Sequence, residues 1–215
     1  MTQEPPPQPD LTTDRPLPPA QAGDPLPPRP DSGRRQRGLV PLVLFLCTLA
    51  STFWAGMASG KPDTLVRNGL LYMTAVMAIL VAHEMGHFLQ CLRNRVPASW
   101  PYFIPMPLSL IGTMGAVIVM GAGRAHRRAL FDIGISGPVA GLLVTLPLLV
   151  YGVATAEVVQ QTLPGTLSIG DPLLLRLAMR LAMRLVRPEL PADAELWFNP
   201  FLQASWVGMF MTGLN

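Results

Sequence analysis

The stretch Gly69–Leu92, GLLYMTAVMAILVAHEMGHFLQCL, decides how this chain is interpreted. It is almost entirely apolar, and it is long enough to cross the hydrocarbon core of a bilayer, which takes about 20 residues. Three ionisable side chains, His83, Glu84 and His87, stand in its second half. Ionisable groups inside a membrane helix are costly and mark functional sites. The stretch therefore predicts a membrane-spanning helix that carries a functional site.

The three ionisable side chains form the pattern H-E-x-x-H. Residues four apart lie on one face of a helix, so His83 and His87 can present their imidazoles to one metal ion. Neutral imidazole is a usual ligand of zinc, and Glu84 is placed to take a proton from water. The pattern predicts Zn²⁺ as the cofactor, His83 and His87 as its ligands and Glu84 as the catalytic residue. The structural alternative is a histidine pair that only bonds neighbouring helices.

The composition indicates an integral, multi-pass membrane protein. Half of the 215 residues are apolar and 13% are charged, whereas a soluble domain carries about 25% charge. The net charge of +3 is small, and no basic patch with interleaved aromatic residues predicts nucleic acid as a partner. Cys47 and Cys91 lie in different apolar segments, which predicts buried thiols rather than a disulfide.

The N-terminal part divides into a tail and a first span. Residues 1–37 contain eleven prolines and little apolar material, which predicts a disordered tail. The uncharged run 38–57 is the first predicted span. Arg34, Arg35 and Arg37 precede it, so the positive-inside rule places the tail in the cytoplasm. We expect the plasma (inner) membrane to hold the chain.

A broken apolar segment follows the second span. Prolines interrupt the first half of residues 97–123 and glycines the second half, while AVIVM within it is typical of a strand. Irregular backbone at membrane depth needs cover from protein or a water-filled cavity. The segment therefore predicts a re-entrant hairpin beside a site, with an interfacial loop as the alternative.

The third span is predicted at 129–153. It begins near an i,i+4 pair, Arg128 and Asp132, for which we expect an ion pair. The small residues of SGPVAG, from Ser136 to Gly141, predict close approach of another helix.

The C-terminal part contains two further helical segments. In residues 172–187 the arginines at 176, 180, 184 and 187 share one face opposite leucine and methionine, which predicts a helix lying in the membrane interface. Asp171 is its expected N-cap. A fourth span is predicted to begin at Trp197, but its apolar run from Ser205 to Asn215 is only about half the length needed to cross. We expect this last helix to be cut short and the chain to be a fragment.

A third zinc ligand is not evident in the sequence. Catalytic zinc sites use three protein ligands, and Gln90 and Arg93 occupy the later positions of the extended H-E-x-x-H pattern. Asp132 is conceivable, although Arg128 is its easier partner. The remaining candidates are predicted in loops or on the outer face, and they are His126, Asp171, Glu189, Asp193 and Glu195.

Taken together, the motifs resemble the site-2 protease family of intramembrane zinc metalloproteases. The pieces are AHEMGH in a span, PYFIPMPLSLIGTMGAVI after it, RRALFDIGISGPVAGL in the next span and GMFMTGLN at the end. The resemblance covers about residues 69–215 and is strongest to bacterial and plastid-type members. It implies an all-α polytopic fold, with a three-helix core around zinc and a re-entrant β-hairpin, over residues 38–215.

The resemblance also implies roles for individual residues. His83 and His87 match the histidine ligands of the family, and Glu84 matches its general base. The third ligand of the family is the aspartate of Leu-Asp-Gly, which would follow Asn215. Asn215 itself matches a family asparagine.

Three functional hypotheses remain open at this point. The first is a membrane-embedded zinc endopeptidase that cuts transmembrane segments of other proteins. The second is a catalytically inactive or fragmentary relative that binds membrane helices, because the third ligand is missing. The third is a metal transporter, although only Asp132 adds a polar group to the other spans.

Overall fold

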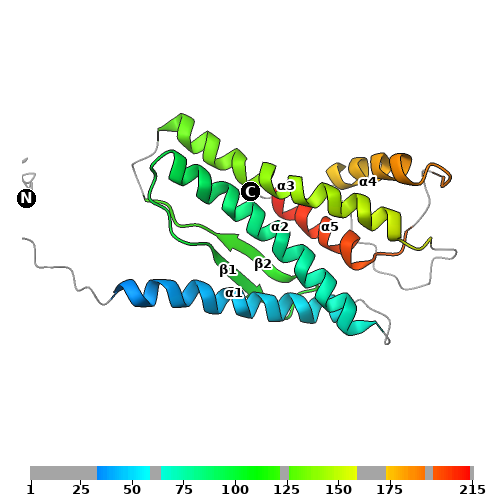
Figure 1. Cartoon of the computed structure of the whole chain (residues 1–215), viewed down its shortest axis with the longest axis horizontal. Helices are drawn as coiled ribbons and strands as arrows, with labels where there is room; N and C mark the ends of the chain where they lie inside the picture. Colours follow the sequence, from blue (N-terminus) through cyan, green and yellow to red (C-terminus); the bar gives the residue numbers. More distant parts are fainter. Residues whose placement is uncertain (1–32, 59–63, 122–125, 159–172, 192–195, 214–215) are drawn as a thin grey trace, which may run out of the picture.

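The computed structural model describes five stretches of the chain, which are residues 33–58, 64–121, 126–158, 173–191 and 196–213. They hold five helices and one β-hairpin (Figure 1). In chain order the elements are α1 (Gly33–Ala58), α2 (Leu65–Arg93), β1 (Tyr102–Met106), β2 (Gly112–Val117), α3 (Arg127–Thr155), α4 (Leu173–Val186) and α5 (Pro200–Gly213). The tail predicted at 1–37 lies almost wholly outside the described residues.

Three of the helices are long and apolar enough to cross a membrane. They comprise Gly38–Ala58 within α1, and the whole of α2 and of α3. The helices predicted at 38–57, 69–92 and 129–153 are therefore confirmed, each with a small extension. The extensions add polar residues such as Arg67 and Arg127, because a helix can continue past the apolar run that sequence analysis detects.

The helices α2, α3 and α5 pack against one another as the centre of the fold (Figure 1). Gly208 of α5 lies where α5 approaches both α2 and α3 closely. A β-carbon on Gly208 would lie 2.7 Å from Thr145 Oγ1 of α3 and 3.0 Å from Ile79 Cδ1 of α2. The missing side chain lets the three helices meet, as small residues do in membrane helix bundles.

The helix α5 begins within the segment predicted from Trp197, and before the apolar run that starts at Ser205. The helix begins at Pro200, and Asn199 caps it. Asn199 Oδ1 accepts hydrogen bonds from the backbone N–H groups of Phe201 at 3.1 Å and Leu202 at 2.9 Å. Its Nδ2 donates to the Gly152 carbonyl at 2.8 Å, so the cap also ties α5 to the end of α3. The uninterrupted apolar run starts later than the helix because polar Asn199 and Gln203 interrupt it.

The β-hairpin lies between α1 and α2 (Figure 1). β1 and β2 are antiparallel, with Tyr102 opposite Val117 and Met106 opposite Gly112. The hairpin predicted within 97–123 is therefore confirmed. The predicted strand AVIVM is only partly right, because β2 ends at Val117.

Two hydrogen bonds hold the tip of the hairpin. Ser51 Oγ of α1 donates to the Gly112 carbonyl at 2.6 Å, and the Tyr72 hydroxyl of α2 donates to the Ile111 carbonyl at 2.9 Å. Tyr72 is fully buried. Gly112 has a φ of +82°, which glycine adopts without strain. The turn is thereby fixed against both helices.

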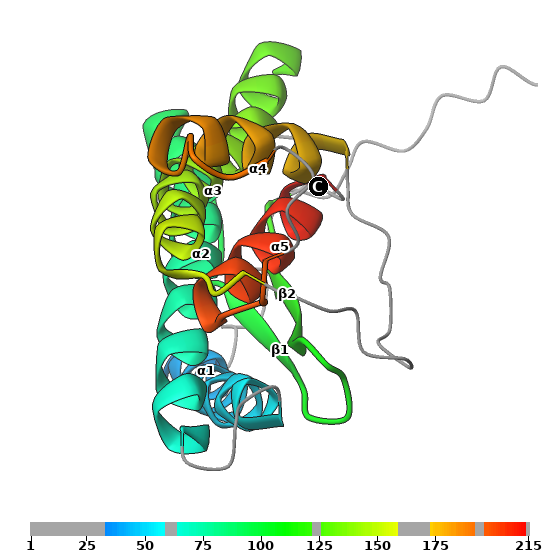
Figure 2. The ribbon, with the colours of Figure 1, turned by 90° about the vertical axis from the view of Figure 1, so that its right-hand side faces the viewer.

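The helix predicted near 172–187 is confirmed as α4, which runs across α3 (Figure 2). Leu175, Ala182 and Met183 are buried against α3 and α5. The arginines at 176, 180 and 184 are exposed, as the periodicity predicts. Asp171, the expected N-cap, lies outside the described residues.

Candidate metal centre

Two glycines of α3 face the two histidines of α2. A β-carbon on Gly137 would overlap the imidazole of His87, and one on Gly141 would lie 3.1 Å from His83 Nδ1. Both pairs have a spacing of four residues, so each pair occupies one face of its helix. The helices are antiparallel, and each imidazole therefore lies against one glycine of the partner helix.

The same contact is supported from the side of α2. A β-carbon on Gly86 would lie 2.5 Å from the Ser136 carbonyl oxygen and 2.9 Å from Ala140 Cβ. The Ser136 hydroxyl donates to the Gly86 carbonyl at 3.0 Å. The close approach predicted for SGPVAG is confirmed. Sequence reasoning missed that the histidine rings fill the space which the glycines of α3 leave.

The two imidazoles are held in a defined arrangement. His87 Nδ1 lies 2.6 Å from the Ile133 carbonyl oxygen. A carbonyl only accepts, so Nδ1 carries the proton and the Nε2 of a neutral His87 is a lone-pair donor. The Nε2 atoms of His83 and His87 are 3.3 Å apart, and the rings meet edge to face. The Nε2 atoms of His83 and His87 therefore face one common position.

This arrangement fits a zinc ion. Two nitrogen ligands at about 2.0–2.1 Å from a tetrahedral zinc are about 3.3–3.4 Å apart, and the two Nε2 atoms already have this separation. Metal-ligating histidines usually donate their other ring N–H to a carbonyl or carboxylate. The Ile133 carbonyl oxygen is such an acceptor for the Nδ1–H group of His87. His83 and His87 would therefore hold the metal.

Glu84 lies beside this pair in a buried position. The side chains of Glu84 and His83 are 5% and 6% exposed. Because one residue turns a helix by 100°, Glu84 projects from the side of α2 next to the histidine face. A buried carboxylate beside a pair of metal ligands is suited to accept and return a proton.

No third histidine, cysteine, aspartate or glutamate joins His83 and His87 in the part of the chain that the structure describes. Glu189 pairs instead with Arg187 at 3.4 Å near the surface, and His126 is exposed just before α3. Three other candidates, Asp171, Asp193 and Glu195, lie outside the described residues, as does Asn215.

Asp132 is half-buried near the start of α3. The expected ion pair between Arg128 and Asp132 is wrong, since these two described residues form no ion pair within 4.0 Å. Holding a long exposed side chain in one geometry costs entropy that a screened ion pair barely offsets.

The last turn of α5 reaches the histidines. Thr212 Oγ1 would lie 3.5 Å from a β-carbon on Gly141, the same glycine that His83 contacts. This hydroxyl is buried and has no hydrogen-bond partner among the described residues. Sequence analysis did not predict a role for Thr212, since its position depends on how α5 packs.

Comparison with known families decides the classification. The sequence profile of peptidase family M50 matches residues 71–213, which include most of α2 and the whole of the hairpin, α3, α4 and α5. This chain belongs to peptidase family M50. The resemblance to the site-2 protease family is thereby confirmed.

This chain is also similar to several plant proteins. The probable zinc metalloprotease EGY1, chloroplastic, of Oryza sativa subsp. japonica is 28% identical over 212 residues, which are 82% of this chain and 35% of the relative. The protein of the same name in Arabidopsis thaliana is 28% identical over 82% of this chain and 36% of its own length. The chain thus spans about a third of the length of these relatives. No solved structure is significantly similar.

Proposed function

We propose that this chain forms the zinc site of an intramembrane metalloendopeptidase, which hydrolyses peptide bonds in or near transmembrane segments. The observation that carries the proposal is the histidine pair, seated on glycines with its Nε2 atoms 3.3 Å apart. Family membership and the printed names of the relatives support zinc protease activity. The length of the three apolar helices supports a site at membrane depth.

In the proposed reaction His83 and His87 would hold the zinc ion, which when bound would supply Lewis-acid polarisation of the scissile carbonyl. Glu84 takes a proton from the attacking water and returns it to the leaving amide nitrogen. A helical substrate hides its carbonyls in hydrogen bonds, so it must unwind locally. The hairpin beside α2 could hold the unwound segment by adding it as a strand.

The end of α5 supports the same site. The resemblance to the site-2 protease family implies that the asparagine motif, which leads to the aspartate zinc ligand, follows α5. Thr212 lies beside Gly141, and Gly141 lies against His83. The last turn of α5 therefore lies near the glycine that His83 contacts, which supports α5 as part of the proposed site.

We further propose that α4 lies in the membrane interface. Leu177, Leu181 and Leu185 repeat every four residues and are exposed, while the arginines at 176, 180 and 184 repeat beside them. Leucine can enter the acyl region while arginine reaches headgroups. The cytoplasmic tail and the plasma membrane stay predictions from the arginines that flank the spans.

The replacement Glu84→Gln tests the enzymatic proposal. The full chain and this variant would be reconstituted in liposomes with a single-span peptide, and both cleavage and bound zinc would be measured. We expect the variant to lose cleavage and to retain zinc, because glutamine is similar in size to glutamate but cannot take a proton. Cleavage at an unchanged rate by Glu84→Gln would contradict the mechanism.

A second function is favoured by one observation, the lack of a third ligand among the described residues. In that case the chain binds membrane helices without cutting them. Peptide binding without cleavage, in a chain that holds no zinc, would support this alternative.

A further inference from the structure

Thr212, in the last turn of α5, differs from the other threonines in the helices that the structure describes. Its hydroxyl is buried and has no hydrogen-bond partner among the described residues. Buried polar groups normally have a partner, so this exception requires an explanation. A helical threonine commonly bonds to the carbonyl four residues earlier. The threonines of α1, α2 and α3 all do so at 2.7–2.9 Å, and they are Thr48, Thr52, Thr74, Thr145 and Thr155.

The packing of α5 on α3 brings this hydroxyl to the ring of His83. A β-carbon on Gly208 would lie 2.7 Å from Thr145 Oγ1, and one on Gly141 would lie 3.5 Å from Thr212 Oγ1. The two helices are therefore antiparallel. The same β-carbon on Gly141 would lie 3.1 Å from His83 Nδ1. The Thr212 hydroxyl and this ring nitrogen thus lie beside the same glycine.

The contact of α5 with α2 gives the same placement. A β-carbon on Gly208 would lie 3.0 Å from Ile79 Cδ1. The helices α2 and α5 run in the same direction, because each is antiparallel to α3. Thr212 and His83 each follow that contact by four residues, so they occupy the same faces one turn further along. Thr212 therefore lies level with His83, where α5 packs against α2 and α3 (Figure 1).

The histidine pair gives Nδ1 of His83 two different roles. His87 Nδ1 donates to the Ile133 carbonyl, so the Nε2 of neutral His87 is an acceptor. In the 3.3 Å contact between the two Nε2 atoms, His83 Nε2 is then the donor, which leaves His83 Nδ1 as an acceptor. When His83 Nε2 binds a metal ion instead, the ring proton resides on Nδ1, and Nδ1 becomes a donor.

We infer that Thr212 is a positioning residue for His83, whose hydroxyl donates to Nδ1 in the metal-free chain and accepts from Nδ1–H when His83 binds zinc. A hydroxyl suits both states because it can donate and accept, whereas a carbonyl only accepts. The link is direct or runs through one water molecule. His83 stays neutral, because Nε2 gives up one proton to water while Nδ1 takes one from water. The inference rests on the proposed function and adds a residue of α5 to the metal centre.

Two replacements at Thr212 separate the hydroxyl from the packing. Thr212→Val keeps the shape of the side chain and removes the hydroxyl, whereas Thr212→Ser keeps the hydroxyl. Thr74→Val, at an exposed position of α2, is the matched control. The full chain is held in detergent micelles with isotope-labelled histidine, and nitrogen NMR signals are recorded from its three imidazoles. The signals missing from His83→Ala are those of His83. Zinc affinity is measured by competition with a chelator.

In the metal-free chain we expect the nitrogen signal of His83 Nδ1 to move toward that of an unbonded ring nitrogen in Thr212→Val. It should stay in place in Thr212→Ser and in the control. Thr212→Val should also bind zinc at least about tenfold more weakly, while Thr212→Ser stays within about twofold of the wild-type chain. An unchanged Nδ1 signal in Thr212→Val, or equal zinc affinity in Thr212→Val and Thr212→Ser, would overturn the inference.

Cleavage of a single-span peptide separates this inference from the proposed function. If Glu84→Gln abolishes cleavage while Thr212→Val changes neither the Nδ1 signal nor zinc affinity, only the inference about Thr212 fails. If Thr212→Val moves the signal and weakens zinc binding but the wild-type chain does not cleave, only the proposed protease activity fails.

Discussion

Gly137 of α3 lies directly against the imidazole of His87, where a β-carbon would overlap the ring. The ring is also held from its other nitrogen, since Nδ1 lies 2.6 Å from the Ile133 carbonyl oxygen one turn earlier in α3. The helix that follows the hairpin therefore both makes room for the metal ligand and orients it. The H-E-x-x-H helix depends on α3 for its geometry.

The replacement Gly137→Ala should weaken zinc binding. The added methyl group must displace His87 or separate the two helices, and loss of such supporting contacts typically costs about 10–100-fold in metal affinity. Gly134→Ala is the matched control in the same helix, because nothing lies within 4 Å of a β-carbon there. Zinc affinity would be measured by competition with a chelator. Equal affinity in the two variants would contradict the packing argument.

The cap at Asn199 should contribute measurably to stability. Asn199→Ala removes the acceptor for two N–H groups of α5 and the bond to Gly152. We expect a loss of about 1 kcal/mol in the free energy of unfolding, measured by circular dichroism in micelles. Asn199→Asp keeps the acceptor and should lose less. Equal losses would show that the bond to Gly152, rather than the cap, stabilises α5.

Removing the hydroxyl of Tyr72 should loosen the hairpin. Tyr72→Phe leaves the Ile111 carbonyl without this donor, at a cost of about 1 kcal/mol. Hydrogen exchange measured by mass spectrometry should become faster around residues 109–113 and stay unchanged in α3. Tyr151→Phe, at an exposed position of α3, is the control. If hydrogen exchange in the hairpin of Tyr72→Phe were unaltered, the hydrogen bond from Tyr72 to Ile111 would not be what holds the hairpin in place.

The arginines of α4 should prefer anionic lipid. Replacing Arg176, Arg180 and Arg184 by Gln removes three charges, each worth about 1 kcal/mol near an anionic surface. In nanodiscs with anionic lipid, we expect α4 to be protected from hydrogen exchange in the wild-type chain and less protected in the variant. In nanodiscs with only zwitterionic lipid the two chains should be alike. Equal protection in anionic lipid would contradict an interfacial α4.

The long helices and the ligand residues could be predicted from the sequence because their signals are local. An uninterrupted apolar run predicts a span by length alone, and the spacing of His83 and His87 places both on one face. The start of α5 was predictable too, since Asn199-Pro200 has the same sequence pattern as the helix start expected at Asp171-Pro172. The apolar run from Ser205 marks only the later part of α5, because the helix itself begins at Pro200.

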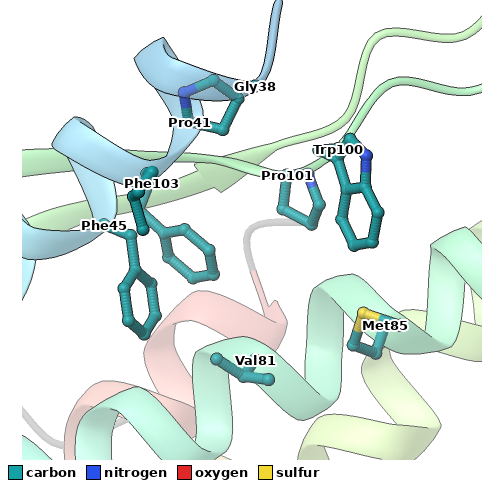
Figure 3. Close-up of a pocket in the computed structure, with 9 residues that line it drawn as sticks. Gly38, Pro41, Phe45, Val81, Met85, Trp100, Pro101 and Phe103 are labelled. Carbon is teal, nitrogen blue, oxygen red and sulfur yellow. The ribbon is translucent and has the colours of Figure 1, made fainter.

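The contacts between helices could not be predicted, because they depend on which faces meet. SGPVAG predicted close packing, but nothing in it identified His87 as the neighbour of Gly137. Thr212 reaches the site only through the packing of α5 against α2 and α3. An apolar pocket is likewise formed by residues of α1, α2 and the hairpin region, such as Phe45, Met85 and Phe103 (Figure 3), and their proximity exists only in the fold.

Zinc K-edge X-ray absorption on the full chain, loaded with zinc, tests the central claim most directly. The account predicts scattering from two imidazoles at about 2.0–2.1 Å, with one imidazole lost in His83→Ala and one lost in His87→Ala. Glu84→Gln should leave the spectrum unchanged. A spectrum without imidazole scattering, or one that neither histidine variant alters, would contradict the assignment of His83 and His87 as the zinc ligands.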